Sequence, residues 1–197
     1  TPVSLCTSTV VLLGALLEES KEGTLTVDTE VLERFFVYSL IWSVAGILET
    51  KDRIKVDKHL RTLLKCLPAL GDSATDTVYE FKVDDTTGDW VHWGSLIPKW
   101  SLPIGGGVGE QFASLLIPTI DSVRCEYNMG LSISQNRAVI LVGGPGTAKT
   151  SIILSVLAAQ DPSATAFKKL SFSSATTPSI FQRQIEGSVE KRQGRTF

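Results

Sequence analysis

Residues 143–150, with the sequence GGPGTAKT, decide the fold of this chain because they combine a glycine-rich loop with a Lys-Thr pair. The apolar run AVILV at 138–142 precedes them and is typical of a buried strand. The run SIILSVLAA at 151–159 follows them and is typical of a helix. A strand, a glycine-rich loop and a helix in this order predict a phosphate-binding P-loop.

The chemistry of a P-loop assigns a role to each part of this stretch. Backbone N–H groups of the loop and of the first helical turn point at phosphate oxygens, and the helix dipole favours the anion. Lys149 is expected to reach the β- and γ-phosphates, and the Thr150 hydroxyl to bind Mg²⁺. The predicted nucleotide-binding residues of this stretch are Gly143, Gly144, Pro145, Gly146, Thr147, Ala148, Lys149, Thr150 and Ser151.

One residue departs from the pattern G-x-x-x-x-G-K-[ST], because Ala148 stands where the pattern has its second glycine. A methyl group is tolerated there if the backbone has ordinary helical dihedral angles. It is harmful if the loop needs a positive φ or a close approach to the phosphate. Nucleotide binding is predicted, with affinity and hydrolysis depending on this residue, and the alternative is a glycine-rich turn that holds no ligand.

Composition excludes several classes of function. The 197 residues are 43% hydrophobic, which is enough for one large domain or parts of two. The net charge of −2, with basic residues scattered along the chain, argues against a nucleic-acid partner. The three cysteines show no metal or redox spacing and are interpreted as reduced core thiols of a cytosolic protein; they are Cys6, Cys66 and Cys125. The two histidines, His59 and His92, are isolated, so no metal site is predicted from them.

Both ends of the sequence lead to expectations. Residues 1–17 are uncharged but have no basic region in front of them, so they are not interpreted as a targeting signal. The uncharged run 35–48 is too short to span a bilayer and predicts a core helix, so no membrane is expected as a partner. Nothing after the P-loop resembles an apolar strand that ends in acidic residues, which an NTPase needs for Mg²⁺ and water. We therefore expect the sequence to be part of a longer chain, and we predict no catalytic residue within it.

The first third of the chain is predicted to be helical. The run 10–17 is typical of a buried helix, and Asp28 or Thr29 is expected to cap a second helix that continues to Leu48. Apolar residues at helical spacing predict a third helix over 57–67, which Pro68 would end.

A β-hairpin is predicted next. Residues 78–83 alternate between apolar and polar, 84–89 form a cluster of turn residues, and 90–93 return as a second strand. Three aromatic residues are expected to cover this hairpin, with a binding surface as the alternative; they are Trp90, Trp93 and Trp100. The glycine-rich stretch 98–109 is interpreted as a connector between domains.

The rest of the chain predicts a parallel sheet. Asp121 or Ser122 is expected to cap a helix that ends near Ser134, on which Arg124 is interpreted as a solvated or salt-bridged arginine. After the P-loop helix, 167–173 is predicted as a second strand. Thr177 is expected to cap a last helix, with apolar positions at Ile180, Phe181, Ile185 and Val189. The order βαβα implies strands that run parallel.

Taken together, four stretches resemble dynein heavy chains. They are FVYSLIWSVAG at 36–46, LIPTIDSVR at 116–124, the P-loop, and FSSATTP at 172–178. The sequence is most similar to axonemal dyneins of the outer-arm type, in which a Gly-Thr-Ala-Lys-Thr loop is also familiar. The resemblance covers nearly the whole chain and implies an α/β fold class, with part of an AAA+ P-loop NTPase core preceded by a helical AAA+ lid that carries the hairpin.

The resemblance also implies a domain organisation and a role. Residues 1–100 would be the end of a second AAA+ module, 101–110 a linker, and 111–197 the start of a third module. Ile117 and Pro118 would line the adenine pocket of a regulatory site for ATP or ADP with Mg²⁺. The main hydrolytic P-loop, the acidic residues, the arginine finger, the stalk and the microtubule-binding tip would all lie outside this chain.

For the whole protein, the resemblance implies a microtubule motor ATPase in the cytoplasm and cytoskeleton, at the axoneme of a cilium or flagellum. Its expected partners are the neighbouring AAA+ modules, the microtubule, and the dynein intermediate and light chains. Two alternatives remain open at this point: a segment of another P-loop ATPase, and a structural AAA+ module whose P-loop is empty.

Overall fold

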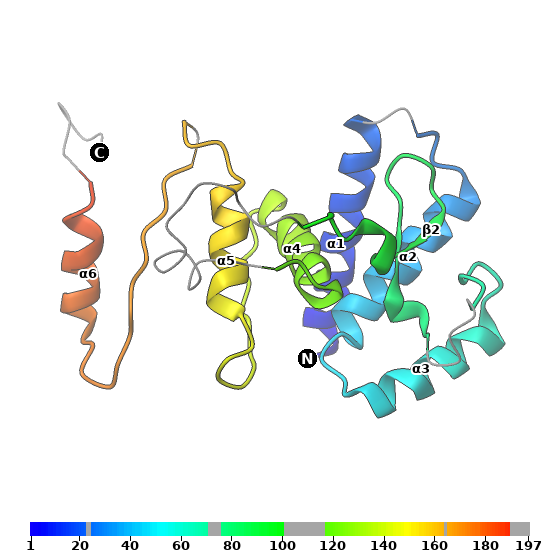
Figure 1. Ribbon diagram of the computed structural model, residues 1–197, viewed down its shortest axis with the longest axis horizontal. Coiled ribbons are helices and arrows are strands. Elements are labelled where there is room, and N and C mark those ends of the chain that lie inside the picture. The colour runs from blue at the N-terminus through cyan, green and yellow to red at the C-terminus, as the bar shows by residue number, and fades with distance from the viewer. Residues whose placement is uncertain (23–24, 71–75, 101–116, 164, 190–197) are drawn as a thin grey trace. The chain divides into compact units, whose positions relative to one another are not determined.

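The computed structural model describes residues 1–22, 25–70, 76–100, 117–163 and 165–189 (Figure 1). The chain divides into two compact units, Thr1–Ala158 and Ala159–Phe197, and each is described by itself. The expected linker at 101–110 lies outside the described residues.

Helices α1 (Pro2–Glu22) and α2 (Thr29–Val44) pack along each other in the first unit (Figure 1). Asp28 caps α2 as predicted, because its carboxylate accepts a hydrogen bond of 2.9 Å from the Val31 N–H. Where the helices cross, the hydroxyls of Thr9 and Ser43 lie 2.6 Å apart. The helix predicted over 10–17 is confirmed, because these residues lie within the longer helix α1.

Helix α2 ends four residues earlier than predicted, at Val44 rather than Leu48. The Arg53 side chain donates hydrogen bonds to the carbonyls of Gly46 and Leu48, at 2.6 and 2.9 Å. These bonds satisfy carbonyl groups that would otherwise be left at the end of the helix. They hold a tight turn into α3 (Thr50–Leu63), which begins and ends earlier than the predicted 57–67.

The main hydrophobic core joins α1, α2, the hairpin and α4 (Ile120–Ser134). Its buried members are Leu12, Ala15, Leu16, Val31, Phe35, Tyr38, Val83, Trp93 and Leu131. By length and composition alone, α1 over Pro2–Ser20 is long and apolar enough to cross a membrane, and it is the single such helix in the described part of the chain. In this structure one face of α1 is occupied by protein, through Leu12, Ala15 and Leu16.

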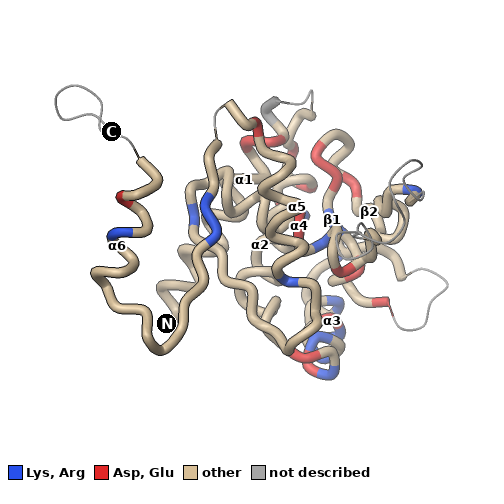
Figure 2. Tube along the Cα trace, turned by 60° about the vertical axis from the view of Figure 1, so that its left-hand side comes forward, with Lys and Arg blue, Asp and Glu red and all other residues tan. Residues whose placement is uncertain are grey.

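The predicted hairpin is confirmed with shorter strands, because residues 78–80 of the expected 78–83 strand, and Trp93 of the expected 90–93 strand, lie in 3-10 helices. Strands β1 (Phe81–Val83) and β2 (Trp90–His92) pair antiparallel, with Lys82 opposite Val91. Short 3-10 helices, η1 (Val78–Glu80) and η2 (Trp93–Leu96), flank the two strands. Figure 2 shows acidic residues around the turn of the hairpin, and basic and acidic residues mixed along α3.

Three contacts tie the hairpin to the helices. The Val78 N–H donates to the buried Asp57 carboxylate at 2.8 Å, and the Trp90 indole donates to the Cys66 carbonyl at 2.6 Å. The Arg34 guanidinium donates to the Gly88 carbonyl at 2.7 Å. Of the three tryptophans expected to cover the hairpin, Trp93 is fully buried and Trp90 is partly buried against the core, whereas Trp100 is 41% exposed.

The P-loop region follows α4. Thr119, rather than the predicted Asp121 or Ser122, is the N-cap of α4, and it forms a reciprocal capping box with Ser122. After the turn at 135–136 the backbone of 137–144 is extended, and helix α5 (Lys149–Ala158) begins after the loop.

Neither unit, taken by itself, contains the predicted parallel βαβα sheet. Within the described residues the single sheet is the two-stranded hairpin, and neither 138–142 nor 167–173 pairs with another strand. Both runs have the composition of buried strands, but a strand forms only when a neighbour satisfies its backbone groups, and each run lies in a different unit. As a result Ile140 and Val142 are 84% and 91% exposed.

The second unit contains an extended segment and helix α6 (Pro178–Glu186). Thr177 caps α6 and Pro178 occupies its first turn, as predicted. The Phe172 and Phe181 rings lie 5.4 Å apart, and Lys168 donates to the Gln184 carbonyl near the end of the helix. Helix α6 ends before Val189, and none of its residues is buried, so the apolar face predicted at Ile180, Phe181, Ile185 and Val189 packs into no core here.

We predict that Gly88→Ala destabilises the hairpin. Gly88 has a φ of +72°, and an added Cβ would lie 2.5 Å from Cγ2 of Val31, in the core. The left-handed backbone and the overpacking together cost about 2–3 kcal/mol. Hydrogen exchange of the β1 and β2 amides in the intact chain should therefore become at least about tenfold faster.

Gly130→Ala is the matched control, because Gly130 lies in α4 and a Cβ there would meet no heavy atom within 4 Å. It should leave exchange in the hairpin unchanged. Unchanged exchange in the Gly88→Ala protein would contradict the prediction.

Candidate functional site

The predicted P-loop folds into a turn between the extended backbone of 138–144 and the start of α5 (Figure 1). Gly146 has a φ of +76°, in the left-handed region that favours glycine. An added Cβ on Gly144 or Gly146 would meet no heavy atom within 4 Å, so the surface of the loop is open at these two residues. Such an open, glycine-lined surface lets a ligand approach the backbone closely.

The side chain of Lys149 crosses the loop. Its ammonium group donates hydrogen bonds of 2.5 Å to the Gly144 carbonyl and 2.9 Å to the Thr147 hydroxyl. The Thr147 hydroxyl in turn donates to the same carbonyl at 2.9 Å. The charge of Lys149 is therefore already held over the loop, beside the N-terminus of α5.

The backbone conformation of Ala148 shows whether the loop needs a positive φ at this position. Its φ is +56°, so the residue in place of the second glycine has a left-handed conformation. For a residue with a Cβ this conformation costs about 1–2 kcal/mol. Its carbonyl accepts a hydrogen bond of 2.9 Å from the Ile152 N–H and so starts α5. Because an alanine side chain has no acceptor, it cannot cap the first N–H groups of the helix. These groups can instead donate hydrogen bonds to an anion.

The groups predicted to hold Mg²⁺ and phosphate are accessible. Thr150 and Ser151 lie in the first turn of α5 and are both exposed. An ammonium group has three N–H donors, of which Lys149 uses two within the loop, and the third can bond a phosphate oxygen. In the described ranges no group of three or more His, Cys, Asp or Glu residues is placed to bind a metal ion. The Thr150 hydroxyl stays the predicted protein ligand for Mg²⁺, on the basis of the P-loop pattern.

Helix α5 rests on α4. Ile152 and Val156 of α5 are buried against Met129, and Cys125 and Ile133 of α4 pack at the edge of this cluster. Burial raises the pKa of the Cys125 thiol, which fits the prediction of a reduced core thiol. Cys66 is also partly buried, whereas Cys6 is exposed, so the core interpretation is wrong for Cys6.

The other face of α4 lies on the main core, where Leu131 is buried and Tyr127 is partly buried. One helix thus contacts both the helix of the P-loop and the helices that precede it in the chain.

Ile117 and Pro118, predicted for the adenine pocket, lie immediately before the cap of α4. Ile117 is 58% exposed, and neither residue lines the two cavities described below. They are accessible to a ligand, and their part in an adenine pocket stays a prediction.

Arg124, interpreted from the sequence as a solvated or salt-bridged arginine, has definite contacts in the structure. Its guanidinium forms ion pairs with Asp121 at 2.5 Å and with Glu80 at 3.6 Å, so the salt-bridged interpretation is confirmed. It also lies over the Trp42 ring at 5.4 Å, and Arg53 lies over the same ring at 5.7 Å.

Desolvation by burial, together with the neighbouring Arg124, lowers the pKa of Arg53. This cluster joins α2, α3, η1 and α4. No sequence motif predicted it, because Arg124 lies 44 residues from Glu80, 71 from Arg53 and 82 from Trp42 in the chain.

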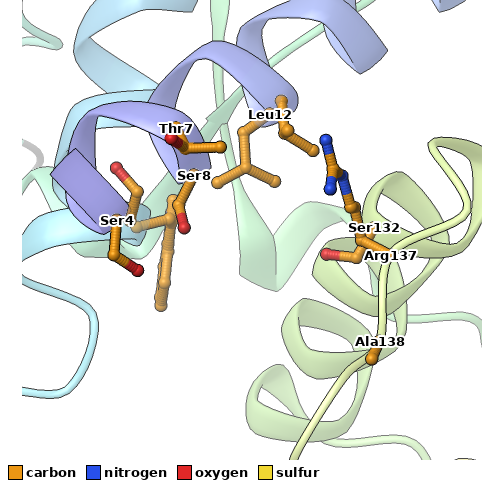
Figure 3. Close-up of a pocket in the computed structure, with 10 residues that line it drawn as sticks. Ser4, Thr7, Ser8, Leu12, Ser132, Arg137 and Ala138 are labelled. Atoms are coloured by element: carbon orange, nitrogen blue, oxygen red, sulfur yellow. The ribbon is translucent and has the colours of Figure 1, made fainter.

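Two cavities lie beside the segment that leads to the P-loop. The first, of about 540 Å³, is lined by polar and apolar side chains together, including three hydroxyl side chains of α1 and the side chains of Ser132 and Arg137 (Figure 3). In Figure 3, Arg137 and Ser132 lie across the cavity from Ser4, Thr7 and Ser8. The second, of about 500 Å³, shares Leu12, Trp42 and Ser132 with the first and extends to Arg53 and Arg124. Neither is lined by the loop residues 143–150, so both are separate from the phosphate cradle.

Comparison with known proteins extends over nearly the whole chain. Residues 1–95 match the family described as the dynein heavy chain AAA lid domain, and residues 108–197 match the P-loop containing dynein motor region. The chain is 43% identical, over 99% of its length, to the gamma chain of the flagellar outer-arm dynein of Chlamydomonas reinhardtii. It is 38% identical over 96% of its length to axonemal dynein heavy chain 5 of Rattus norvegicus, and 36% identical over 94% to axonemal dynein heavy chain 8 of Homo sapiens. It spans 4–5% of the length of these relatives.

We predict that Ala148→Gly stabilises the loop and the start of α5. The substitution removes the strain of the φ of +56°, and this gain exceeds the extra entropy that glycine has in the unfolded chain. The net gain is about 0.5–1 kcal/mol, which should slow hydrogen exchange at the first amides of α5 in the intact chain about two- to fivefold.

Ala158→Gly, at the other end of α5, is the control with the opposite expected sign, because glycine is unfavourable in a helix that needs no positive φ. Faster exchange in the Ala148→Gly protein would show that the alanine is not strained.

Proposed function

Because this chain belongs to the dynein heavy chain family, we propose that residues 143–151 form the phosphate-binding part of a regulatory nucleotide site in a dynein motor ring. The supporting observation is the position of Lys149, whose ammonium group is held across the glycine-rich loop at the start of α5. Family membership sets aside the alternative of a different class of P-loop ATPase.

The loop has the chemistry that a nucleoside di- or triphosphate requires. The remaining N–H of Lys149 and the first N–H groups of α5 offer donors to the β- and γ-phosphates. Thr150 offers its hydroxyl to Mg²⁺, which would neutralise phosphate charge and fix the orientation of the phosphates. Ile117 and Pro118, immediately before the cap of α4, offer an exposed and a partly exposed apolar side chain to the adenine. We infer binding of ATP or ADP with Mg²⁺, without assigning a catalytic base within this chain.

The placement within the ring is also part of the proposal. Residues 1–100 would be the end of the second AAA+ module, 101–110 the linker and 111–197 the start of the third. Helix α4 supports this regulatory role, because it packs on α5 through Met129 and on the preceding helices through Leu131. A nucleotide that changes the position of α5 would therefore act on both sides of the junction, in proportion to its differential affinity for the two arrangements.

For the whole protein we propose ATP-driven movement along microtubules, at the axoneme of a cilium or flagellum. The names of the relatives, which refer to flagellar outer-arm and axonemal dyneins, support this proposal. The neighbouring AAA+ modules would be the immediate partners of this chain. The microtubule and the intermediate and light chains would be contacted by other parts of the protein.

A second candidate function is a structural module with an empty loop. The observation that favours it is the strained Ala148, whose methyl group stands where a P-loop normally lets phosphate come close to the backbone. This candidate and the nucleotide site give opposite results in the following experiment.

We predict that Lys149 of the intact heavy chain reacts selectively with an acyl-phosphate derivative of ATP. A lysine amine held beside the phosphates would attack the acyl carbonyl and release ATP, leaving an amide that mass spectrometry can locate. Competing ATP or ADP should reduce labelling of Lys149 at least about tenfold, because lysine recognition in a P-loop depends on the β-phosphate.

Lys51, an exposed lysine on α3, is the internal control and should be labelled equally with and without competitor. Labelling of Lys149 that is no greater than that of Lys51 and does not respond to ATP would support the empty loop.

We also predict that Lys149→Ala in the full motor lowers the velocity of microtubule gliding and changes its dependence on nucleotide. Loss of one charged donor to phosphate costs about 1.5–3 kcal/mol of binding, so the site would be largely empty at nucleotide concentrations that normally fill it. Unchanged velocity together with unchanged nucleotide dependence would show that the site has no regulatory role.

A further inference from the structure

The side chain of Thr147 connects the two ends of the loop. Its hydroxyl donates to the Gly144 carbonyl at 2.9 Å and accepts from the Lys149 ammonium at 2.9 Å. A hydroxyl can do both at once, because it has one donor and two acceptor positions. The P-loop pattern leaves this position free for any residue, so the pattern gives Thr147 no role.

These bonds restrict a side chain that is otherwise flexible. Lysine has four rotatable bonds to its ammonium group, and an exposed lysine loses entropy when it is fixed in one position. The Gly144 carbonyl alone would hold the ammonium at one point, whereas the carbonyl and the Thr147 hydroxyl together hold it at two. With two of its three N–H groups directed into the loop, Lys149 has one remaining donor, whose direction is then set.

The first glycine of the loop has a matching role. A Cβ on Gly143 would lie 3.1 Å from the Thr147 hydroxyl oxygen, which is closer than ordinary contact, and 3.8 Å from the Lys149 nitrogen. Gly143 does not have a positive φ, so its backbone conformation is open to other residues. The absence of a side chain at Gly143 thus leaves room for the Thr147 hydroxyl in its bridging position.

We propose that Thr147 is a positioning residue of the nucleotide site: its hydroxyl holds the Lys149 ammonium so that the remaining N–H faces the bound phosphates, and Gly143 provides the space for it. The proposal rests on the nucleotide-binding function proposed above. Thr147 does not itself contact the phosphates in this proposal, and it acts on them by positioning Lys149.

The test measures the concentration of ATP or ADP that halves the acylation of Lys149 in the intact heavy chain. This half-protecting concentration reports nucleotide affinity at this site alone. Thr147→Val keeps the shape of the side chain and removes the hydroxyl, and it should raise the half-protecting concentration about five- to tenfold. Thr147→Ser keeps the hydroxyl and should stay within about twofold of the natural protein. Hydrogen exchange in α5 should be the same in all three proteins.

A double-mutant cycle tests the link to Gly143. Gly143→Ala should weaken protection severalfold when Thr147 is present, and less when Thr147→Ala has removed the oxygen that the new methyl group would meet. Additive effects of the two substitutions would overturn the role given to Gly143.

The outcomes separate the two proposals. If ATP protects Lys149 and Thr147→Val binds as tightly as the natural protein, the positioning role is wrong and the nucleotide site stands. The role is also wrong if Thr147→Ser weakens binding as much as Thr147→Val, or if the Val variant loses exchange protection along α5. If ATP does not protect Lys149 in the natural protein, both proposals fail.

Discussion

The position of α4 between two hydrophobic clusters is the constraint on which the rest of the first unit depends. Leu131 is buried with α1, α2 and the hairpin, whereas Met129, two residues earlier, is buried with the helix of the P-loop. In the first turns of α4, Arg124 adds an ion pair with Glu80 and a ring contact with Trp42, which are both far away in the sequence. A helix fixed on two faces in this way cannot shift relative to one cluster without disturbing the other, since packed interiors tolerate little displacement. The loop is therefore built on a support that belongs as much to the preceding helices as to the P-loop itself.

Local signals in the sequence predicted the elements whose stability is local. The Asp28 and Thr177 caps, Pro178 in a first helical turn and the alternating strands of the hairpin are each decided by residues within a few positions of one another. The end of α2 and the start of α3 were misplaced because the Arg53 side chain, several residues further on, satisfies the carbonyls after α2. The parallel sheet is absent from each unit for a different reason. The composition of 138–142 is typical of a buried strand. A sheet also needs a neighbouring strand, and no local pattern predicts which segment that is.

In the candidate site, too, the sequence predicted what depends on local residues and not what depends on the folded loop. The order of strand, loop and helix predicted the P-loop, and Lys149 lies at the start of α5 as the pattern requires. The pattern could not decide whether Ala148 is strained, because its left-handed φ is a property of the folded loop. It also gave no role to Thr147, whose contacts depend on the fold of the lysine back over the loop. Arg124 was noticed in the sequence, but its partners Glu80 and Trp42 come from the other side of the chain's midpoint.

The exposed segment 138–142 has a consequence for biosynthesis. Its backbone is extended and without a strand partner in the described structure, and Ile140 and Val142 are almost fully exposed. A short, uncharged, β-branched stretch in this state is a template for pairing with any other extended chain, including a second copy. While the protein is being made on the ribosome, such a stretch needs protection until a neighbouring strand pairs with it. Chaperones that hold extended apolar peptides are suited to this task.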